Sequence, residues 1–186
     1  MVKNGHKNVS DGAADFERLH GGDAVQKVRK LLKRFRAAML VTDGGGELHA
    51  RPMALVGKSE FDGSLWFFTE RGSGKIVEAE LGQATSLIFQ NDRASVYLHL
   101  LGHAVEVKDR DVMAQMYTPL LKTWFPEGLD DPELTMLRFT AESGKYWENP
   151  GGKIRMLAAF TGALISGEPS QVGREGELEI EAAAGS

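Results

Sequence analysis

Short apolar runs separated by turn-forming residues dominate the first two thirds of the chain. The run from Ala37 to Thr42 is followed by Asp43 and three glycines, and then by a second run from Glu47 to Val56. This order is typical of a β-hairpin. Further strands are predicted over 65–69, 85–90, 95–107 and 134–141. Because short turns join successive strands, we expect mostly antiparallel pairing.

Other segments show helical spacing. Apolar residues at intervals of three and four predict a helix from Asp23, its N-cap, to about Arg36. A shorter helix is expected from Ser73 to Leu81, where Gly82 would end it. Segments 109–121 and 153–164 also have helical patterns, and 177–180 suits a terminal strand. Six strands in hairpin order with a few helices predict an α+β, mainly β fold: a small antiparallel barrel with peripheral helices.

Length and composition indicate one globular unit. The chain has 186 residues, of which 42% are hydrophobic and 26% charged, as in ordinary soluble domains. We expect a flexible N-terminal tail over 1–22, one domain over 23–168 and a C-terminal extension over 169–186. The net charge of -4 gives no indication of a nucleic-acid partner, and the basic residues over 27–36 suit a solvated helix face.

Several kinds of site are excluded by what the chain lacks. It contains no cysteine, so disulfides, thiolate catalysis and cysteine metal sites are ruled out. No apolar run approaches the ~18 residues of a membrane span, and we expect a cytoplasmic protein with no membrane partner. His99 and His103 would stand ~13 Å apart on a strand, too far to share one zinc ion. No metal site is predicted.

The stretch from Leu65 to Lys75 carries the strongest chemical signal. A strand of bulky apolar residues ends in Thr69, and Ser73 and Lys75 follow where a helix is expected to begin. Hydroxyls, free backbone N–H groups and a cation at a helix start favour a phosphate. Arg51, on a neighbouring strand, has the geometry to bind the same group with its guanidinium fork. The sequence therefore predicts a phosphate-bearing ligand here.

Each of these residues also has a purely structural interpretation. Arg51 suits a surface ion pair, Ser73 suits a simple helix N-cap, and Phe68 suits core packing. Pro52 predicts that the strand of Arg51 is irregular or lies at a sheet edge. Trp147 precedes a loop rich in proline and glycine, where an aromatic ring either packs or stacks on a planar ligand.

The order of these motifs resembles the pyridoxamine 5′-phosphate oxidase-like flavoproteins, and within them the general stress protein 26 group. The matching motifs are Arg51-x-Met53, then Phe68-Thr69-x-x-x-Ser73-x-Lys75, and then a strand ending in Gly102. Supporting pieces are Trp124-Phe125-Pro126-Glu127-Gly128, Asp131-Pro132 and Lys145-Tyr146-Trp147.

The resemblance implies a six-stranded antiparallel split β-barrel that forms a homodimer and binds flavin mononucleotide (FMN), or FAD, between subunits. Arg51 and Lys75 would hold the phosphate with the hydroxyls of Thr69 and Ser73. Met53, Ala54 and Phe68 would line the flavin ring, and Trp147 of the other subunit would lie near it.

Departures from the family pattern argue against pyridoxamine phosphate oxidation itself. Gly74 stands where the oxidase has a basic residue, and Tyr97 where it has a glutamine. The resemblance implies an FMN-dependent oxidoreductase of unknown substrate and unknown catalytic residues. The alternatives are a flavin-binding stress buffer or sensor without turnover, and the same fold holding a deazaflavin or haem.

Overall fold

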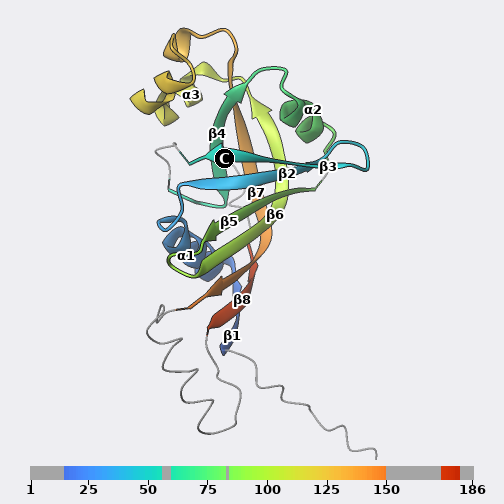
Figure 1. Ribbon diagram of the computed structural model, residues 1–186, viewed down its shortest axis with the longest axis vertical. Coiled ribbons are helices and arrows are strands. Elements are labelled where there is room, and N and C mark those ends of the chain that lie inside the picture. Colours follow the sequence, from blue (N-terminus) through green and yellow to red (C-terminus); the bar gives the residue numbers. More distant parts are fainter. Residues whose placement is uncertain (1–14, 56–59, 83, 150–172, 181–186) are drawn as a thin grey trace, which may run out of the picture.

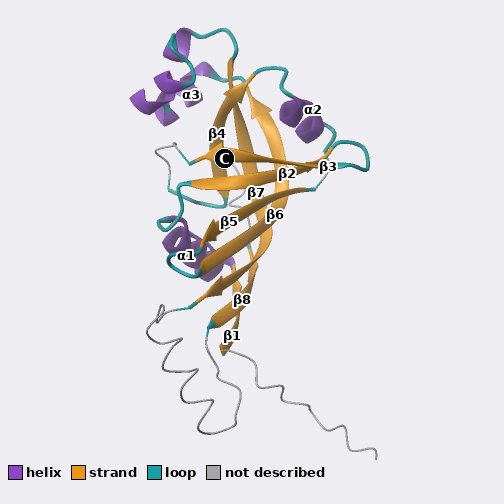
Figure 2. Ribbon diagram, in the orientation of Figure 1, coloured by secondary structure: helices purple, strands orange, loops and turns teal. Residues whose placement is uncertain are grey.

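Eight strands form one curved sheet, with helices at its periphery (Figures 1 and 2). The computed structural model describes residues 15–55, 60–82, 84–149 and 173–180; the predicted helix over 153–164 lies outside them. The strands are β1 (Asp15–His20), β2 (Ala37–Asp43), β3 (Leu48–Ala54), β4 (Ser64–Glu70), β5 (Thr85–Asn91), β6 (Val96–Val107), β7 (Leu134–Glu148) and β8 (Arg174–Glu179). The helices are α1 (Gly21–Leu32), α2 (Gly74–Glu80) and α3 (Arg110–Met116), with 3-10 turns η1 (Pro119–Thr123) and η2 (Gly128–Asp130).

Strand β7 organises the sheet. One edge of β7 pairs with β6 over 136–148, while the other edge pairs first with β4, over 134–140, and then with β8, over 143–148. The strand order is β1-β8-β7-β6-β5-β2-β3, with β4 beside β7. The predicted class, a mainly β split-barrel fold with peripheral helices, is confirmed. The details differ, because the sheet has eight strands and the described strands do not close into a barrel.

The first strand was not expected. Residues 15–22 were assigned to a flexible tail, but Asp15–His20 forms β1 and Gly21 begins α1. Strand β1 pairs with β8 in parallel, the one parallel pair among the described strands. Its partner lies at the opposite end of the chain, so no local turn signal announces the pairing.

Alternation along the strands separates an inner from an outer face. In β2, Ala38, Leu40 and Thr42 are buried, whereas Met39 between them is exposed. Side chains two residues apart lie on one face of a strand, so the inner positions of neighbouring strands build one core. Strand β2 lies beside β5, as the register of Leu40 with Leu87 shows. The main core also includes α1, and a smaller cluster lies between β4, β7 and the α3–η1 segment.

A glycine is required where β6 changes register against β7. The shift lies between Leu101 and Gly102, and a Cβ atom on Gly102 would stand 1.9 Å from the carbonyl oxygen of Thr140. We expect Gly102→Ala to destabilise the fold by about 3 kcal/mol, at the upper end of overpacking costs, since the obstacle is backbone. Chemical denaturation measures this. The control is Gly22→Ala in α1, where an added Cβ atom would meet nothing within 4 Å beyond its own helix backbone, and it should change stability little. Equal effects of both variants would contradict this expectation.

Candidate functional site

A cavity of about 420 Å³ lies between β3, β4, the start of α2 and the η1 segment. The residues that line it are Ala37, Pro52, Met53, Ala54, Phe68, Thr69, Glu70, Lys75, Leu121, Trp124 and Phe125. This volume is in the range of small-molecule and cofactor sites. Most of the wall is apolar, and Thr69, Glu70 and Lys75 supply the polar part.

The structure brings five of the predicted residues together at this cavity. Met53 and Ala54 come from the end of β3, Phe68 and Thr69 from the end of β4, and Lys75 from the first turn of α2. Neither strand pairs with the other, so their ends are free to form the two sides of an opening. The hydroxyl-bearing residue Thr69 is only 4% exposed.

Proline fits the position of β3 in the sheet. Pro52 lies opposite Met39 of β2, and β3 is the terminal strand of the path. An edge strand has one row of N–H groups without a ladder partner, so the missing N–H of proline costs no sheet hydrogen bond there. The edge position predicted from Pro52 is therefore confirmed.

The turn between β4 and α2 differs in one respect from the prediction. Ser73 occupies the N-cap position of α2, but its side chain makes no capping hydrogen bond. Its hydroxyl instead donates to the carbonyl oxygen of Glu70 at 2.8 Å. The hydroxyl oxygen keeps its lone pairs for another donor, although Ser73 does not line the cavity.

Lys75 carries its charge in an unfavourable setting. Burial first, and then the neighbouring charge of Arg51, hold the pKa of Lys75 below that of an ordinary lysine, while Glu70 and Glu78 act in the opposite direction. Arg51, which does not itself line the cavity, thus lies close enough to Lys75 for the two cations to disfavour each other. An anion placed between them would reverse this effect.

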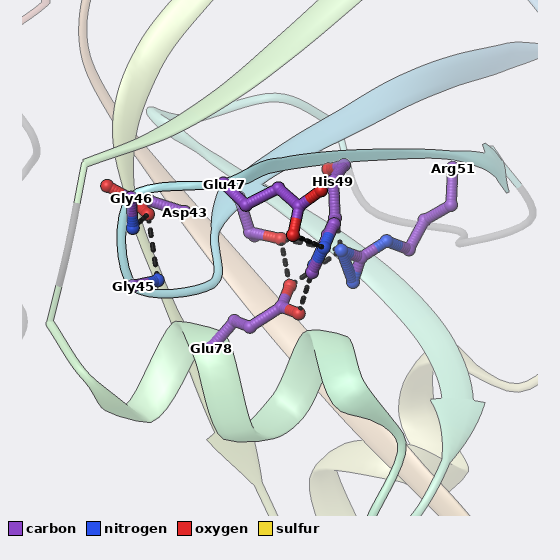
Figure 3. A network of polar contacts seen from close by, with 8 residues as sticks. Asp43, Gly45, Gly46, Glu47, His49, Arg51 and Glu78 are labelled. Carbon is purple, nitrogen blue, oxygen red and sulfur yellow. Dashed lines mark hydrogen bonds and ion pairs between the residues drawn. The ribbon is translucent and has the colours of Figure 1, made fainter.

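Arg51 belongs to a polar network between β2, β3 and α2 (Figure 3). Its Nη2 donates to Glu78 Oε2 at 2.6 Å and to the hydroxyl of Thr42 at 2.8 Å. The other oxygen of Glu78 lies 2.7 Å from Nδ1 of His49, and the Thr42 hydroxyl donates to Oε2. The ion pair left open by the sequence is present, but it is not a surface pair: the Arg51 and Glu78 side chains are only 21% and 12% exposed.

Trp147 lies elsewhere in the same chain. It stands on β7, opposite Tyr97 of β6 and Glu175 of β8, and lines a smaller, separate cavity with these residues. A ring at this position does not reach the Lys75 cavity of its own subunit. The family resemblance implies a place for Trp147 near the flavin ring of a partner subunit.

Sequence reasoning missed part of the cavity wall and the carboxylate behind it. Trp124 and Phe125 entered the sequence analysis only as part of a family motif; both line the cavity, where Phe125 is buried and Trp124 is 56% exposed. Leu121 joins them from η1. Glu78 was not considered, although its place three residues after Lys75, on the same short helix, is a signal that could have found it.

Comparison with known proteins places the chain in a family. The profile of the family described as "Pyridoxamine 5′-phosphate oxidase like" matches residues 23–170. Protein bli-3 of Neurospora crassa is 26% identical over 141 residues, which is 72% of this chain and 68% of that protein. The chain belongs to the pyridoxamine 5′-phosphate oxidase-like family.

Solved structures support the same assignment. A protein from Jannaschia sp. CCS1 described as a general stress protein 26 is 25% identical, with a TM-score of 0.67 over 84% of this chain and 98% of that one. The general stress FMN/FAD binding protein of Xanthomonas citri is 28% identical, with a TM-score of 0.61 over 69% and 91% of the two chains. The predicted resemblance to the general stress protein 26 group is confirmed.

Two other features are absent from the described part of the chain. No described helix is long and apolar enough to cross a membrane. No group of three or more histidine or acidic side chains there could hold a metal ion.

Proposed function

We propose that this protein binds FMN in the cavity between β3, β4 and α2. The observation that carries the proposal is Lys75, a cation that lines a mostly apolar cavity, with the charge of Arg51 close enough behind it to lower the pKa of the lysine. A flavin nucleotide has the matching chemistry, with an anionic phosphate at one end and a flat, largely apolar ring at the other. The related Xanthomonas citri protein, described as binding FMN or FAD, supports the same ligand class.

The residues present fit such a ligand. Lys75 and the fork of Arg51 would hold the phosphate, with the hydroxyl of Thr69 as a further donor; the Ser73 hydroxyl, which donates to Glu70 in this structure, would have to turn to join them. Met53, Ala54 and Phe68 would lie along the ring. A phosphate between the cations would favour the charged form of Lys75, which burial and Arg51 otherwise disfavour.

Comparing FMN with riboflavin tests the phosphate part of the proposal. The two ligands share the ring and differ in the phosphate, so FMN should bind at least tenfold more tightly, as measured by quenching of flavin fluorescence. FAD, whose phosphate is esterified, is the third ligand of the series. Equal affinities for FMN and riboflavin would contradict a phosphate site at Lys75.

The finer proposal is that the protein is a flavin-dependent oxidoreductase. Bound flavin supplies hydride and electron transfer, while this chain binds it, orients the ring against Met53 and Phe68, and keeps water from that wall. Steady oxidation of NAD(P)H with an added acceptor would support an enzyme. Flavin that stays bound but does not turn over would support the alternative, a flavin-binding stress buffer or sensor.

The lowered pKa of Lys75 gives a pH prediction. A bound phosphate favours the ammonium form, so FMN affinity is full below the pKa of Lys75 in the free protein and falls as the pH rises through it. We expect this fall to begin below the pKa of about 10.4 of an ordinary lysine. Titrations of FMN across the alkaline range measure it. Lys75→Arg, which stays charged, should remove the fall; an identical profile in this variant would contradict the role of Lys75.

We further propose a homodimer that buries the outer face of the sheet. Met39, Ile88 and Leu101 lie on this face of β2, β5 and β6 and are 39%, 44% and 37% exposed. Two residues that line the cavity belong to the same face. Pro52 lies opposite Met39, and Ala37 lies two residues before Met39 on β2. A second copy on this face would cover apolar area and lie beside the ligand.

The dimer proposal predicts the effect of a charge on this face. Ile88→Glu should shift the protein from dimer to monomer, because a carboxylate would be buried without a partner. Sedimentation velocity at micromolar concentration measures the shift. Leu81→Glu, at an exposed apolar position of 59% exposure next to α2, is the control and should stay dimeric. A monomeric native protein, or a dimeric Ile88→Glu variant, would contradict the proposed interface.

A further inference from the structure

Two of the charged residues of helix α2 act in different places. Lys75 lines the cavity, whereas Glu78 holds Arg51 of β3 by an ion pair of 2.6 Å. Residues three apart lie on neighbouring positions of one helix face. The helix therefore connects both cations of the proposed phosphate site, one covalently and one through Glu78.

We propose that Glu78 is a positioning residue that fixes the guanidinium of Arg51 relative to Lys75. It acts through Arg51 and does not touch the ligand. The inference rests on the proposed function, because it concerns the residues that would hold the phosphate of FMN.

The hydrogen bonds of Arg51 within the described part of the chain do not use Nε or Nη1 of its guanidinium. All of its contacts within the described part of the chain, to Glu78, Thr42 and the carbonyl of His49, use Nη2. A guanidinium has five N–H donors, so Nε and Nη1 keep three of them for a ligand. Holding one corner of the fork reduces the freedom that Arg51 would lose on binding a phosphate.

Glu78 is itself held firmly. Thr42 and Arg51 donate to Oε2, and the ring of His49 lies against Oε1 (Figure 3). The hydrogen bond from Thr42, followed by that from His49 and the charge of Arg51, lowers the pKa of Glu78, so that the carboxylate stays ionised. Both carboxylate oxygens are thus occupied, and their orientation is set by three partners.

The turn before β3 makes room for this arrangement. A Cβ atom on Gly44 would lie 2.8 Å from Cε1 and 3.0 Å from Nδ1 of His49. A side chain at residue 44 would therefore force the imidazole to shift from its place against Oε1 of Glu78. Asp43 holds the same turn by accepting hydrogen bonds from the backbone N–H groups of Gly45 and Gly46.

A carboxylate near a phosphate also repels it, and the two effects have opposite signs. Positioning predicts that loss of Glu78 weakens FMN binding, whereas simple repulsion predicts that it strengthens binding. Two features favour positioning: the paired side chains are mostly buried, and the negative charge of Glu78 is compensated by Arg51 at 2.6 Å. The test therefore has a definite expected sign.

The experiment is a double-mutant cycle with FMN and riboflavin as ligands. Glu78→Ala should weaken FMN binding about tenfold in the native background, as loss of an outer-shell partner commonly does. It should have less than a twofold effect, by the same reasoning, when Arg51→Ala is already present. Riboflavin, which lacks the phosphate, should bind equally to the native protein and to Glu78→Ala.

Controls separate positioning from a general loss of structure. Glu78→Gln keeps the acceptor oxygen and should lie between the native protein and Glu78→Ala, while Glu80→Ala, on the same helix, should bind FMN normally. Unchanged or tighter FMN binding by Glu78→Ala, or an equal loss for riboflavin, would overturn the inference. If the native protein does not distinguish FMN from riboflavin, the proposed phosphate site itself fails.

Discussion

Replacing Arg51 with alanine is expected to weaken the binding of FMN by about 10- to 100-fold. Charge-assisted hydrogen bonds contribute about 1.5–3 kcal/mol, and the substitution removes those that the guanidinium would make to the phosphate. It also leaves Glu78, whose side chain is 12% exposed, without its cation beside the proposed phosphate position. Titration of the variant with FMN, followed by flavin fluorescence, measures the change.

The matched control removes a cation outside the site. Lys33 is exposed and follows the end of α1, so Lys33→Ala should bind FMN like the native protein. Riboflavin affinity should be the same in the native protein and in Arg51→Ala. A loss of FMN affinity below twofold in Arg51→Ala, well under the expected range, would remove Arg51 from the site.

The second large effect concerns stability and lies at the other end of the sheet. Lys27 of α1 donates to Glu148 of β7 at 2.6 Å, lies 3.6 Å from Glu17 of β1, and stands 4.1 Å above the centre of the Tyr146 ring. The Tyr146 hydroxyl, fully buried, donates to Glu17. We expect Lys27→Ala to lower the free energy of unfolding by about 3 kcal/mol, since it leaves two carboxylates without their shared cation.

Urea denaturation of Lys27→Ala tests this account, with Lys30→Ala as the control. Lys30 lies three residues further along α1 and is exposed, so its loss should change stability by less than about 0.5 kcal/mol. Similar stabilities of the two variants would show that the cluster around Tyr146 does not hold β1 and α1 to the sheet.

Local patterns predicted the hairpins of this fold well. The Asp43 turn between β2 and β3, and the turn around Asn91 between β5 and β6, are where polar and glycine residues interrupt apolar runs. The prediction of one helix over 109–121 was wrong in length: α3 ends at Met116, and Pro119 begins the 3-10 turn η1. Proline disfavours helical backbone at the preceding residue, so the break was readable from the sequence.

Pairings between distant segments were not predictable in the same way. Strand β7 was expected to end at Ala141 but continues to Glu148, through Ser143 and Gly144, which resemble a turn. It is extended there because both of its edges are paired, by β6 and by β8. A β-strand preference of this kind depends on tertiary context, which a single local window lacks.

In the candidate site, too, some residues were predictable from the local sequence and others depended on contacts between distant segments. The cation Lys75 and the hydroxyl of Thr69 follow directly from a strand ending before a glycine turn and a helix, and the structure places both at one cavity. The contribution of Trp124 depended on where the segment after α3 folds back, which the sequence left open. The partnership of Glu78 with Arg51 depended on how α2 lies against β2 and β3.

The absorbance spectrum of the purified protein, recorded before and after adding FMN and removing the excess by gel filtration, decides whether the protein binds FMN. We expect flavin bands that co-elute with the protein and that are retained much more weakly when riboflavin replaces FMN. A protein that stays colourless after exposure to FMN would contradict the claim. Bands of a haem or of a deazaflavin in the protein as purified would assign the cavity to another cofactor.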